Sequence, residues 1–347
     1  MLGMFGMFGL FGMFGLFGLF GMFGMFGPSP APMKHLAEYV LTRAVAATAM
    51  CLPHAARLAI GRSLGSLAYA LDARHRNITL ANVDMAFGDE KSPAEKQAIA
   101  EGAFRHFGAM LFEMVTLGRP TWEDLEHRFE FEGVERLEEA RRRGKGVILV
   151  TAHFGNWELH GVAHGYRLGK LHVVAREQDN PYLNRWLEEI RSVSGNKVVY
   201  KNRALGQIRE LMRDGGTVAI VTDQNVHLED AVFVDFFGQK AATTPIASWF
   251  ALRTGAALLP AFCYPLPGGR YRAVYESPID LEPYRDLDRD AAIAAVTQKL
   301  AGIQESHIRK APDCWLWMHR RWRTRPAKSE KSAKSKSPDE SVEAALT

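Results

Sequence analysis

The stretch that decides the fold is Val147-Ile-Leu-Val-Thr-Ala-His153-Phe-Gly-Asn-Trp-Glu158. Its first five residues form a short apolar run, which is typical of a strand buried on both faces. Gly155 permits a sharp turn, and Asn156 is a favourable N-cap for a following helix. The stretch therefore predicts a strand, a loop that carries His153, and a helix with Glu158 in its first turn.

Strand and helix signals alternate along the chain on both sides of this stretch. Strands are expected at 147–151, 171–175, 197–200, 217–222, 256–264 and 271–276, and helices near 157–168, 181–194, 204–213, 245–254 and 291–310. The run Ser92-Pro93-Ala94-Glu95 is a capping box with proline at the first helical position, so it predicts the start of a long amphipathic helix. This alternation predicts an α/β fold with a mainly parallel sheet flanked by helices.

The composition is that of a folded protein with a mild positive charge. The 347 residues are 47% apolar and 24% charged, with a formal net charge of +4. The three cysteines are far apart and form no metal-binding spacing, so we expect a reducing compartment and no metal or cofactor. We also expect no nucleic-acid partner, because no nucleic-acid module accompanies the basic residues.

Two basic clusters suggest different surroundings. The arginines at 141–143 favour a solvated face. Arg320, Arg321, Arg323 and Arg325 surround Trp322, which suits either an anionic membrane surface or a solvated face.

The two ends of the chain differ from its middle. Residues 1–33 hold eight consecutive Met/Leu-Phe-Gly triplets and predict a low-complexity extension. Residues 34–72 are rich in alanine and leucine, and the part at 36–60 is long enough to span a bilayer, so we expect a membrane anchor or an interfacial helix. A soluble helical hairpin is the alternative. A folded domain is expected at 73–326 and a disordered tail at 327–347.

The His153-to-Glu158 spacing suggests acid–base chemistry at the carboxyl end of a strand, where open α/β sheets bind ligands. Histidine is suited to take the proton of a hydroxyl group near neutral pH, and a carboxylate on its other nitrogen would fix its tautomer. No G-x-S-x-G run follows an expected strand, so no serine nucleophile elbow is expected, which favours direct attack by an acceptor hydroxyl. The spacing alone is weak evidence, and a core histidine next to a strand is the alternative.

Further motifs resemble one known family. In chain order they are 153–158, Ala175-Arg176, Asp179-Asn180-Pro181, Thr222-Asp223-Gln224-Asn225, Phe236-Phe237-Gly238, Thr244-Pro245 and the closing run at 315–322. Together they resemble the late acyltransferases of lipid A biosynthesis, over residues 34–326. The resemblance implies an inner-membrane enzyme with its catalytic domain on the cytoplasmic face.

The resemblance also implies substrates and residue roles. The acyl donor would be acyl carrier protein or a coenzyme A thioester, and the acceptor a hydroxyl of a phosphorylated glycolipid, the lipid A precursor. His153 would be the general base, Glu158 its partner, and Arg176 the group that holds a phosphate or the developing negative charge. Another glycolipid or aminolipid acceptor, a thioesterase and a non-catalytic lipid-binding protein are the alternatives.

The remaining candidates have both functional and structural interpretations. Asp223 is expected to orient Arg176 or a neighbouring backbone group, or to serve a turn. Phe236 and Phe237 line an acyl groove or pack in the core. The other predicted substrate-binding residues are Gly155, Asn156, Gln224 and Asn225. His160 and His164 lack the intervening glutamate of a zinc-binding H-E-x-x-H motif, so no metal site is expected.

Overall fold

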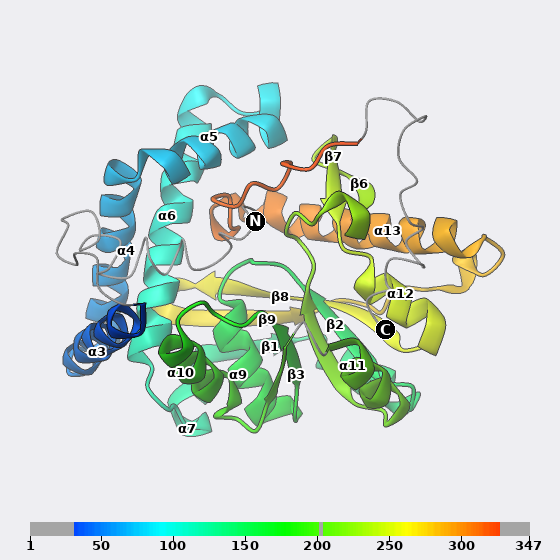
Figure 1. The fold of residues 1–347 in the computed structure, drawn as a ribbon, viewed down its shortest axis with the longest axis horizontal. Helices are drawn as coiled ribbons and strands as arrows, with labels where there is room; N and C mark the ends of the chain where they lie inside the picture. Colours follow the sequence, from blue (N-terminus) through cyan, green and yellow to red (C-terminus); the bar gives the residue numbers. More distant parts are fainter. Residues whose placement is uncertain (1–30, 201–203, 327–347) are drawn as a thin grey trace.

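The computed structural model describes residues 31–200 and 204–326 (Figure 1). The predicted tail at 327–347 and nearly all of the predicted extension at 1–33 lie outside these residues.

A seven-stranded sheet forms the centre of the molecule (Figure 1). Its order is β1-β9-β8-β2-β5-β3-β4, and all neighbouring strands are parallel except β8 and β9. The strands are β1 (Phe129–Glu132), β2 (Val147–Thr151), β3 (His172–Ala175), β4 (Lys197–Tyr200), β5 (Thr217–Val221), β8 (Ala257–Leu266) and β9 (Arg270–Tyr275). The prediction of a mainly parallel sheet in an α/β fold is confirmed.

Helices cover both faces of the sheet, and β2 shows why. Val147 and Leu149 pack among residues of α8 (Val134–Arg142) and α9 (Trp157–Leu168). Ile148 and Val150 point the other way, toward a core completed by α11 (Ala204–Arg213), α12 (Ile246–Thr254) and α13 (Arg289–Lys310). Side chains alternate across a strand, so an unbroken apolar run is buried on both faces.

A group of helices from the first part of the chain stands beside the sheet, at the left of Figure 1. It comprises α3 (Ala31–Met50), α4 (His54–Leu71), α5 (Ala73–Phe87) and α6 (Pro93–Thr116). Buried side chains of α3, α4 and α6 form one hydrophobic cluster with those of α10 (Pro181–Ser192), and the short helix α7 (Trp122–Leu125) follows α6. The predicted capping box is confirmed, because Ser92 and Glu95 bond each other's backbone at the start of α6.

Residues 36–60, which are long enough to span a bilayer, belong to two helices and not to one. The helix α3 ends at Met50, and α4 begins after Pro53. Proline lacks the N–H that a continuing helix needs, so it marks the break. Within the described ranges, no helix is both long and apolar enough to cross a membrane.

Three strands were not predicted from the sequence. β1 is a four-residue edge strand, and β6 (Val232–Phe236) pairs with β7 (Gln239–Thr243) in a hairpin apart from the main sheet. Phe237 and Gly238 form its turn, with φ of 50° and 68°. Two residues at positive φ make the tight turn that matches strand twist. The remaining elements are the 3₁₀ turns Gly88–Glu90, Glu126–Arg128, Leu228–Asp230, Pro267–Gly269, Glu282–Tyr284 and Pro312–Cys314.

Candidate active site

Two adjacent parallel strands bring His153 and Asp223 together. The register of β2 with β5 pairs Thr151 with Val221, so two residues further along His153 lies opposite Asp223. Gln304 of α13 fastens the two strand ends, since its amide donates to the Thr151 carbonyl (3.1 Å) and to Thr222 Oγ1 (2.9 Å). The carboxyl ends of β2 and β5 are therefore a fixed platform for both side chains.

Asp223 is the carboxylate that holds the His153 ring. His153 Nδ1 lies 2.7 Å from Asp223 Oδ1, and the His153 backbone N–H donates to Oδ2 over 2.8 Å. The indole N–H of Trp315 donates to the same Oδ2 over 2.7 Å. Burial alone would raise the pKa of Asp223, but His153 and these donors outweigh it and lower that pKa.

The ionised Asp223 fixes the tautomer of His153. A carboxylate only accepts, so the proton of a neutral ring lies on Nδ1 and the lone pair on Nε2. The side-chain amide of Gln224 lies 3.3 Å from that Nε2, which makes it a weak donor there. This arrangement leaves Nε2 with one weak donor, and such a nitrogen can accept a proton.

Glu158 is not hydrogen-bonded to His153, which corrects the expected pairing. It lies in the first turn of α9, as predicted, but its carboxylate takes two bonds from Arg191, from Nε (2.8 Å) and from Nη2 (2.5 Å). Burial alone would raise the pKa of Glu158. The charge and hydrogen bonds of Arg191, together with the nearby His153, outweigh this effect, so the pKa lies below its ordinary value. Glu158 therefore interacts with His153 through charge and makes no hydrogen bond to it.

Helix α6 holds the loop between His153 and Glu158. His106 Nε2 lies 3.1 Å from the Gly155 carbonyl oxygen, and the Asn156 amide donates to Glu113 Oε2 over 3.0 Å. Asn156 is also the N-cap of α9, because its Oδ1 accepts from the Leu159 backbone. Both predictions for this loop, a glycine turn and an asparagine cap, are confirmed, and the polar atoms of Asn156 are used within the protein.

Glu113 is the centre of a buried polar network behind this loop. Its carboxylate also bonds to His54 Nε2 (2.6 Å), to Arg128 and to the hydroxyl of Tyr271. Burial alone would raise the pKa of Glu113, but these partners outweigh burial, so the pKa lies below its ordinary value. The network links α4, α6 and β9 to the loop at Asn156.

Arg176 follows β3 as predicted but does not contact Asp223. Its side chain is 42% exposed and donates to Asp179 Oδ1 over 2.9 Å. The sheet order does not separate them, because β3 lies next to β5; the Asp223 carboxylate is instead occupied by His153 and Trp315. The expected pairing of Asp223 with Arg176 is therefore wrong, and the alternative contact with neighbouring backbone is confirmed by the bond to the His153 N–H.

Asn225 fastens the carboxyl-terminal segment. Its backbone N–H donates to His319 Nε2 (2.9 Å), and its side chain exchanges bonds with Thr324. Burial lowers the pKa of His319 to about 4, so this ring is neutral at physiological pH.

Phe236 and Phe237 are buried in an aromatic core. Phe236 packs on Trp315 and Trp322, with ring centroids 5.6 and 6.0 Å apart. Phe237 packs on Trp317 at 5.8 Å. This is the core-packing alternative, and an acyl chain could touch these rings only if the core opened.

The basic cluster near the carboxyl end is also partly buried. Arg321 is 1% exposed and Trp322 is 4% exposed. Arg321 donates to the Ala242 carbonyl over 2.6 Å, and burial lowers the pKa of its guanidinium to about 10. Both positions expected from the sequence, on a solvated face or on a membrane surface, are therefore wrong for Arg321 and Trp322, which lie in the protein interior.

Sequence reasoning missed Arg191, Gln304 and the role of Trp315. Arg191 had a detectable signal, because the buried positions of α10 are Leu183, Trp186, Leu187, Ile190 and Arg191. A charged residue on the apolar stripe of a helix needs a buried partner.

Residues 31–324 match the model of the bacterial lipid A biosynthesis acyltransferases. The chain belongs to this family. It is 28% identical over 278 residues to the lipid A biosynthesis lauroyltransferase of Escherichia coli (strain K12), covering 79% of this chain and 88% of that protein.

Two other relatives show the range of the family's similarity. The lipid A biosynthesis palmitoleoyltransferase of the same strain is 27% identical over 278 residues, covering 79% of this chain and 87% of that protein. The phosphatidylinositol mannoside acyltransferase of Mycolicibacterium smegmatis (strain ATCC 700084 / mc(2)155) is 26% identical over 194 residues, covering 54% and 60%. The resemblance inferred from the motifs is confirmed.

His160 and His164 of this lipid A acyltransferase family member share one tyrosine. Arg141 only donates, and its Nη2 lies 3.3 Å from His164 Nε2, so the His164 proton lies on Nδ1. His164 Nδ1–H donates a hydrogen bond to the Tyr275 hydroxyl oxygen (2.8 Å), and the Tyr275 O–H donates to His160 Nε2 (2.9 Å). Burial lowers the pKa of His160 to about 4, so the chain of bonds holds neutral rings.

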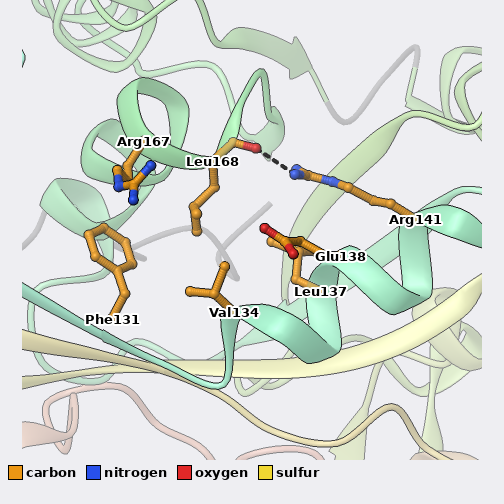
Figure 2. Close-up of a pocket in the computed structure, with 7 residues that line it drawn as sticks. All are labelled: Phe131, Val134, Leu137, Glu138, Arg141, Arg167 and Leu168. Atoms are coloured by element: carbon orange, nitrogen blue, oxygen red, sulfur yellow. Dashed lines mark hydrogen bonds between the residues drawn. The ribbon is translucent and has the colours of Figure 1, made fainter.

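A pocket of about 360 Å³ lies near Arg141 (Figure 2). Arg141 also donates to Thr217, the first residue of β5, and to the Leu168 carbonyl, the dashed line in Figure 2. The pocket is thus at the amino ends of the strands, away from His153. Its lining residues are Phe131, Val134, Leu137, Glu138, Arg141, Arg167 and Leu168.

Proposed function

We propose that this family member transfers a fatty acyl chain from acyl carrier protein to a hydroxyl of a lipid A precursor, with His153 as general base. The observation that carries the proposal is the contact of Asp223 with His153 Nδ1, which leaves the Nε2 lone pair available. Membership of the lipid A acyltransferase family supports the acyl transfer and the glycolipid acceptor.

In the proposed reaction the acceptor oxygen attacks the thioester carbonyl directly. His153 Nε2 takes the hydroxyl proton as the new C–O bond forms. The tetrahedral intermediate then breaks its C–S bond, and the leaving thiol receives that proton from the imidazolium. Asp223 stabilises the imidazolium and keeps its orientation, and the charge of the Glu158 carboxylate adds to this stabilisation.

Arg176 is proposed to bind negative charge on the substrate. It follows β3 at the same edge of the sheet as His153, and its exposed guanidinium suits a phosphate group. Asp179, to which Arg176 donates, is itself exposed, so a phosphate can compete for this contact. The N–H groups at the start of α9 offer a second site for developing negative charge.

The enzyme is proposed to work on the cytoplasmic face of the inner membrane, where both substrates meet. Large apolar side chains are exposed along α3 and α4, namely Met33, Leu36, Val40, Met50, Ile60, Leu67 and Leu71. Exposed apolar residues gathered on neighbouring helices are typical of a membrane-contacting surface.

The experiment is an acyl-transfer assay with the full-length protein in membranes. Labelled lauroyl-, myristoyl- and palmitoyl-carrier protein, and the matching coenzyme A thioesters, are supplied with a lipid A precursor. We expect one carrier-protein donor to be used by wild type, and His153→Ala to abolish transfer. Free fatty acid without an acylated acceptor would indicate a thioesterase, and no reaction from the folded wild type would favour a lipid-binding role.

Another glycolipid acceptor is the second candidate, because a relative is named for acylation of phosphatidylinositol mannoside. The chemistry at His153 would be unchanged. Mass spectrometry of lipids from a deletion strain distinguishes the two. Lipid A that lacks one secondary acyl chain supports the first candidate, whereas unchanged lipid A with another glycolipid underacylated supports the second.

A further inference from the structure

The carboxyl-terminal segment 312–324 wraps around the proposed catalytic residues. The Leu316 backbone N–H donates to the His153 carbonyl over 3.1 Å, and the Gly155 N–H donates to the Cys314 carbonyl over 2.8 Å. Between them, the Trp315 indole donates to Asp223 Oδ2. Three consecutive residues of the segment therefore contact the strand end, the turn and the buried carboxylate.

Trp315 cannot easily move away from Asp223. The side chain is 2% exposed and packs edge-on against Trp317, with ring centroids 4.6 Å apart. Asn82 of α5 fixes the segment from outside, because its amide donates to the Trp317 and His319 carbonyls over 2.7 Å each. The packing on Trp317 and the hydrogen bonds from Asn82 thus keep the Trp315 indole N–H directed at Asp223.

We propose that Trp315 is a positioning residue for acyl transfer, acting on His153 through Asp223. This proposal rests on the proposed function. With Oδ2 held by the indole and by the His153 backbone N–H, the carboxylate plane is fixed, and Oδ1 is kept on His153 Nδ1. Loss of the indole donor leaves Oδ2 held by the His153 backbone N–H alone, which loosens the carboxylate plane and weakens the bond that sets the His153 tautomer and ring angle.

The ionisation of Asp223 depends on the same bond. The Trp315 bond is one of the contacts that lower the pKa of this buried carboxyl, so removing it moves that pKa upward. A protonated Asp223 cannot accept from His153 Nδ1 with its full negative charge. The acid side of the pH–rate profile should then move to higher pH.

The test compares Trp315→Phe with Trp317→Phe. Both substitutions remove one indole N–H from a buried ring of the same segment, but the Trp317 indole donates to the Pro312 carbonyl over 2.6 Å and not to Asp223. We expect Trp315→Phe to lower kcat by about 10- to 100-fold, with KM within about twofold of wild type. In Trp315→Phe the acid limb of the pH–rate profile, where the rate falls as the pH is lowered, should move to higher pH. In Trp317→Phe this limb should stay at the wild-type position.

The outcomes separate this proposal from the function beneath it. Partial unfolding lowers the measured rate at every pH, so both rates are scaled to the folded fraction and the position of the acid limb decides the question. Equal kcat values and equal acid limbs in the two variants, with an active wild type, would overturn the role of Trp315 and leave the proposed function intact. An inactive wild type would overturn the proposed function, and with it a positioning role in that reaction.

Discussion

At the scale of single residues, two buried carboxylates near His153 have different partners. Asp223 contacts the ring and depends on hydrogen-bond donors, whereas Glu158 forms a two-pronged ion pair with Arg191. Asp223 is 2% exposed and Glu158 is 8% exposed. A buried ion pair is costly to break from one side, because the remaining charge has no water to solvate it.

We therefore predict that Glu158→Gln destabilises the fold by about 3–5 kcal/mol, since it leaves Arg191 buried without a carboxylate. The free energy of unfolding is measured by denaturant titration. Glu189→Gln is the control, because Glu189 lies on the same helix as Arg191 and pairs with Arg119 at the surface. Exposed pairs contribute about 0–1 kcal/mol, and an equal effect of both substitutions would contradict the account.

The same pair predicts a pH dependence of stability. The pKa of Glu158 is lower in the folded protein than in the unfolded chain. Its stabilisation is therefore complete above the ordinary carboxyl pKa of about 4.3 and is lost as the pH falls through the lower folded-state value. Thermal unfolding between pH 7 and pH 3 should show a smaller acid loss in Glu158→Gln than in wild type; identical slopes would argue against the pair.

The sequence predicted the position of His153 and Glu158 but not the pairing. The H-x-x-x-x-E spacing places Glu158 in the first helical turn, and local chain geometry suffices for that. The Asp223 contact depends on β5 lying beside β2, with a register that aligns residues 70 apart. Strand order is set by packing across the whole sheet, which no local pattern reveals.

At the scale of elements, the turn between β2 and α9 is the tightest point of the site. Gly155 has φ of +59°, and a Cβ there would lie 1.6 Å from the Cys263 carbonyl oxygen of β8. The loop therefore passes directly against a neighbouring strand. Only glycine permits both this backbone conformation and this approach.

Gly155→Ala is expected to prevent folding or to displace the His153 loop, with loss of acyl transfer. Gly144→Ala is the matched control, since Gly144 has φ of +69° but no neighbouring atom within 4 Å of the place that a Cβ would take. It should cost about 1–2 kcal/mol and keep activity. Folded yield and transfer rate are measured for both, and an active Gly155→Ala protein would show that the turn is not constrained in this way.

Most elements around the site were predictable because their signals are local. The apolar run at β2, the Asn-Pro start of α10 and the capping box of α6 each appear in a few residues. β1 and the β6–β7 hairpin were missed, because β1 is an edge strand of only four residues and a two-stranded ribbon carries a weak pattern. The motif Phe236-Phe237-Gly238 is the end and turn of that hairpin.

At the scale of the whole molecule, α3 and α4 form the side that we propose to contact the membrane (Figure 1). Leu36 and Val40 are four residues apart on α3 and are 45% and 56% exposed. Residues at this spacing lie on one face of a helix. Charged substitutions there should weaken membrane binding without disturbing the core.

Accordingly, the double variant Leu36→Asp, Val40→Asp should lose affinity for anionic phospholipid vesicles by about tenfold or more, since each buried leucine or valine contributes about 1.5–3 kcal/mol. Co-sedimentation with vesicles measures this. Leu287→Asp is the control, because Leu287 is equally exposed but precedes α13, far along the chain. Unchanged vesicle binding of the double variant would place the membrane contact elsewhere.

The central claim is that His153 acts as the base because Asp223 holds it. The most direct test is the acyl-transfer rate of folded Asp223→Asn, which keeps the shape of the side chain but removes its charge. We predict that kcat falls by about 10³- to 10⁴-fold, as expected when a histidine base loses the carboxylate that sets its tautomer, while KM changes little. Transfer by Asp223→Asn at the wild-type rate would contradict the claim.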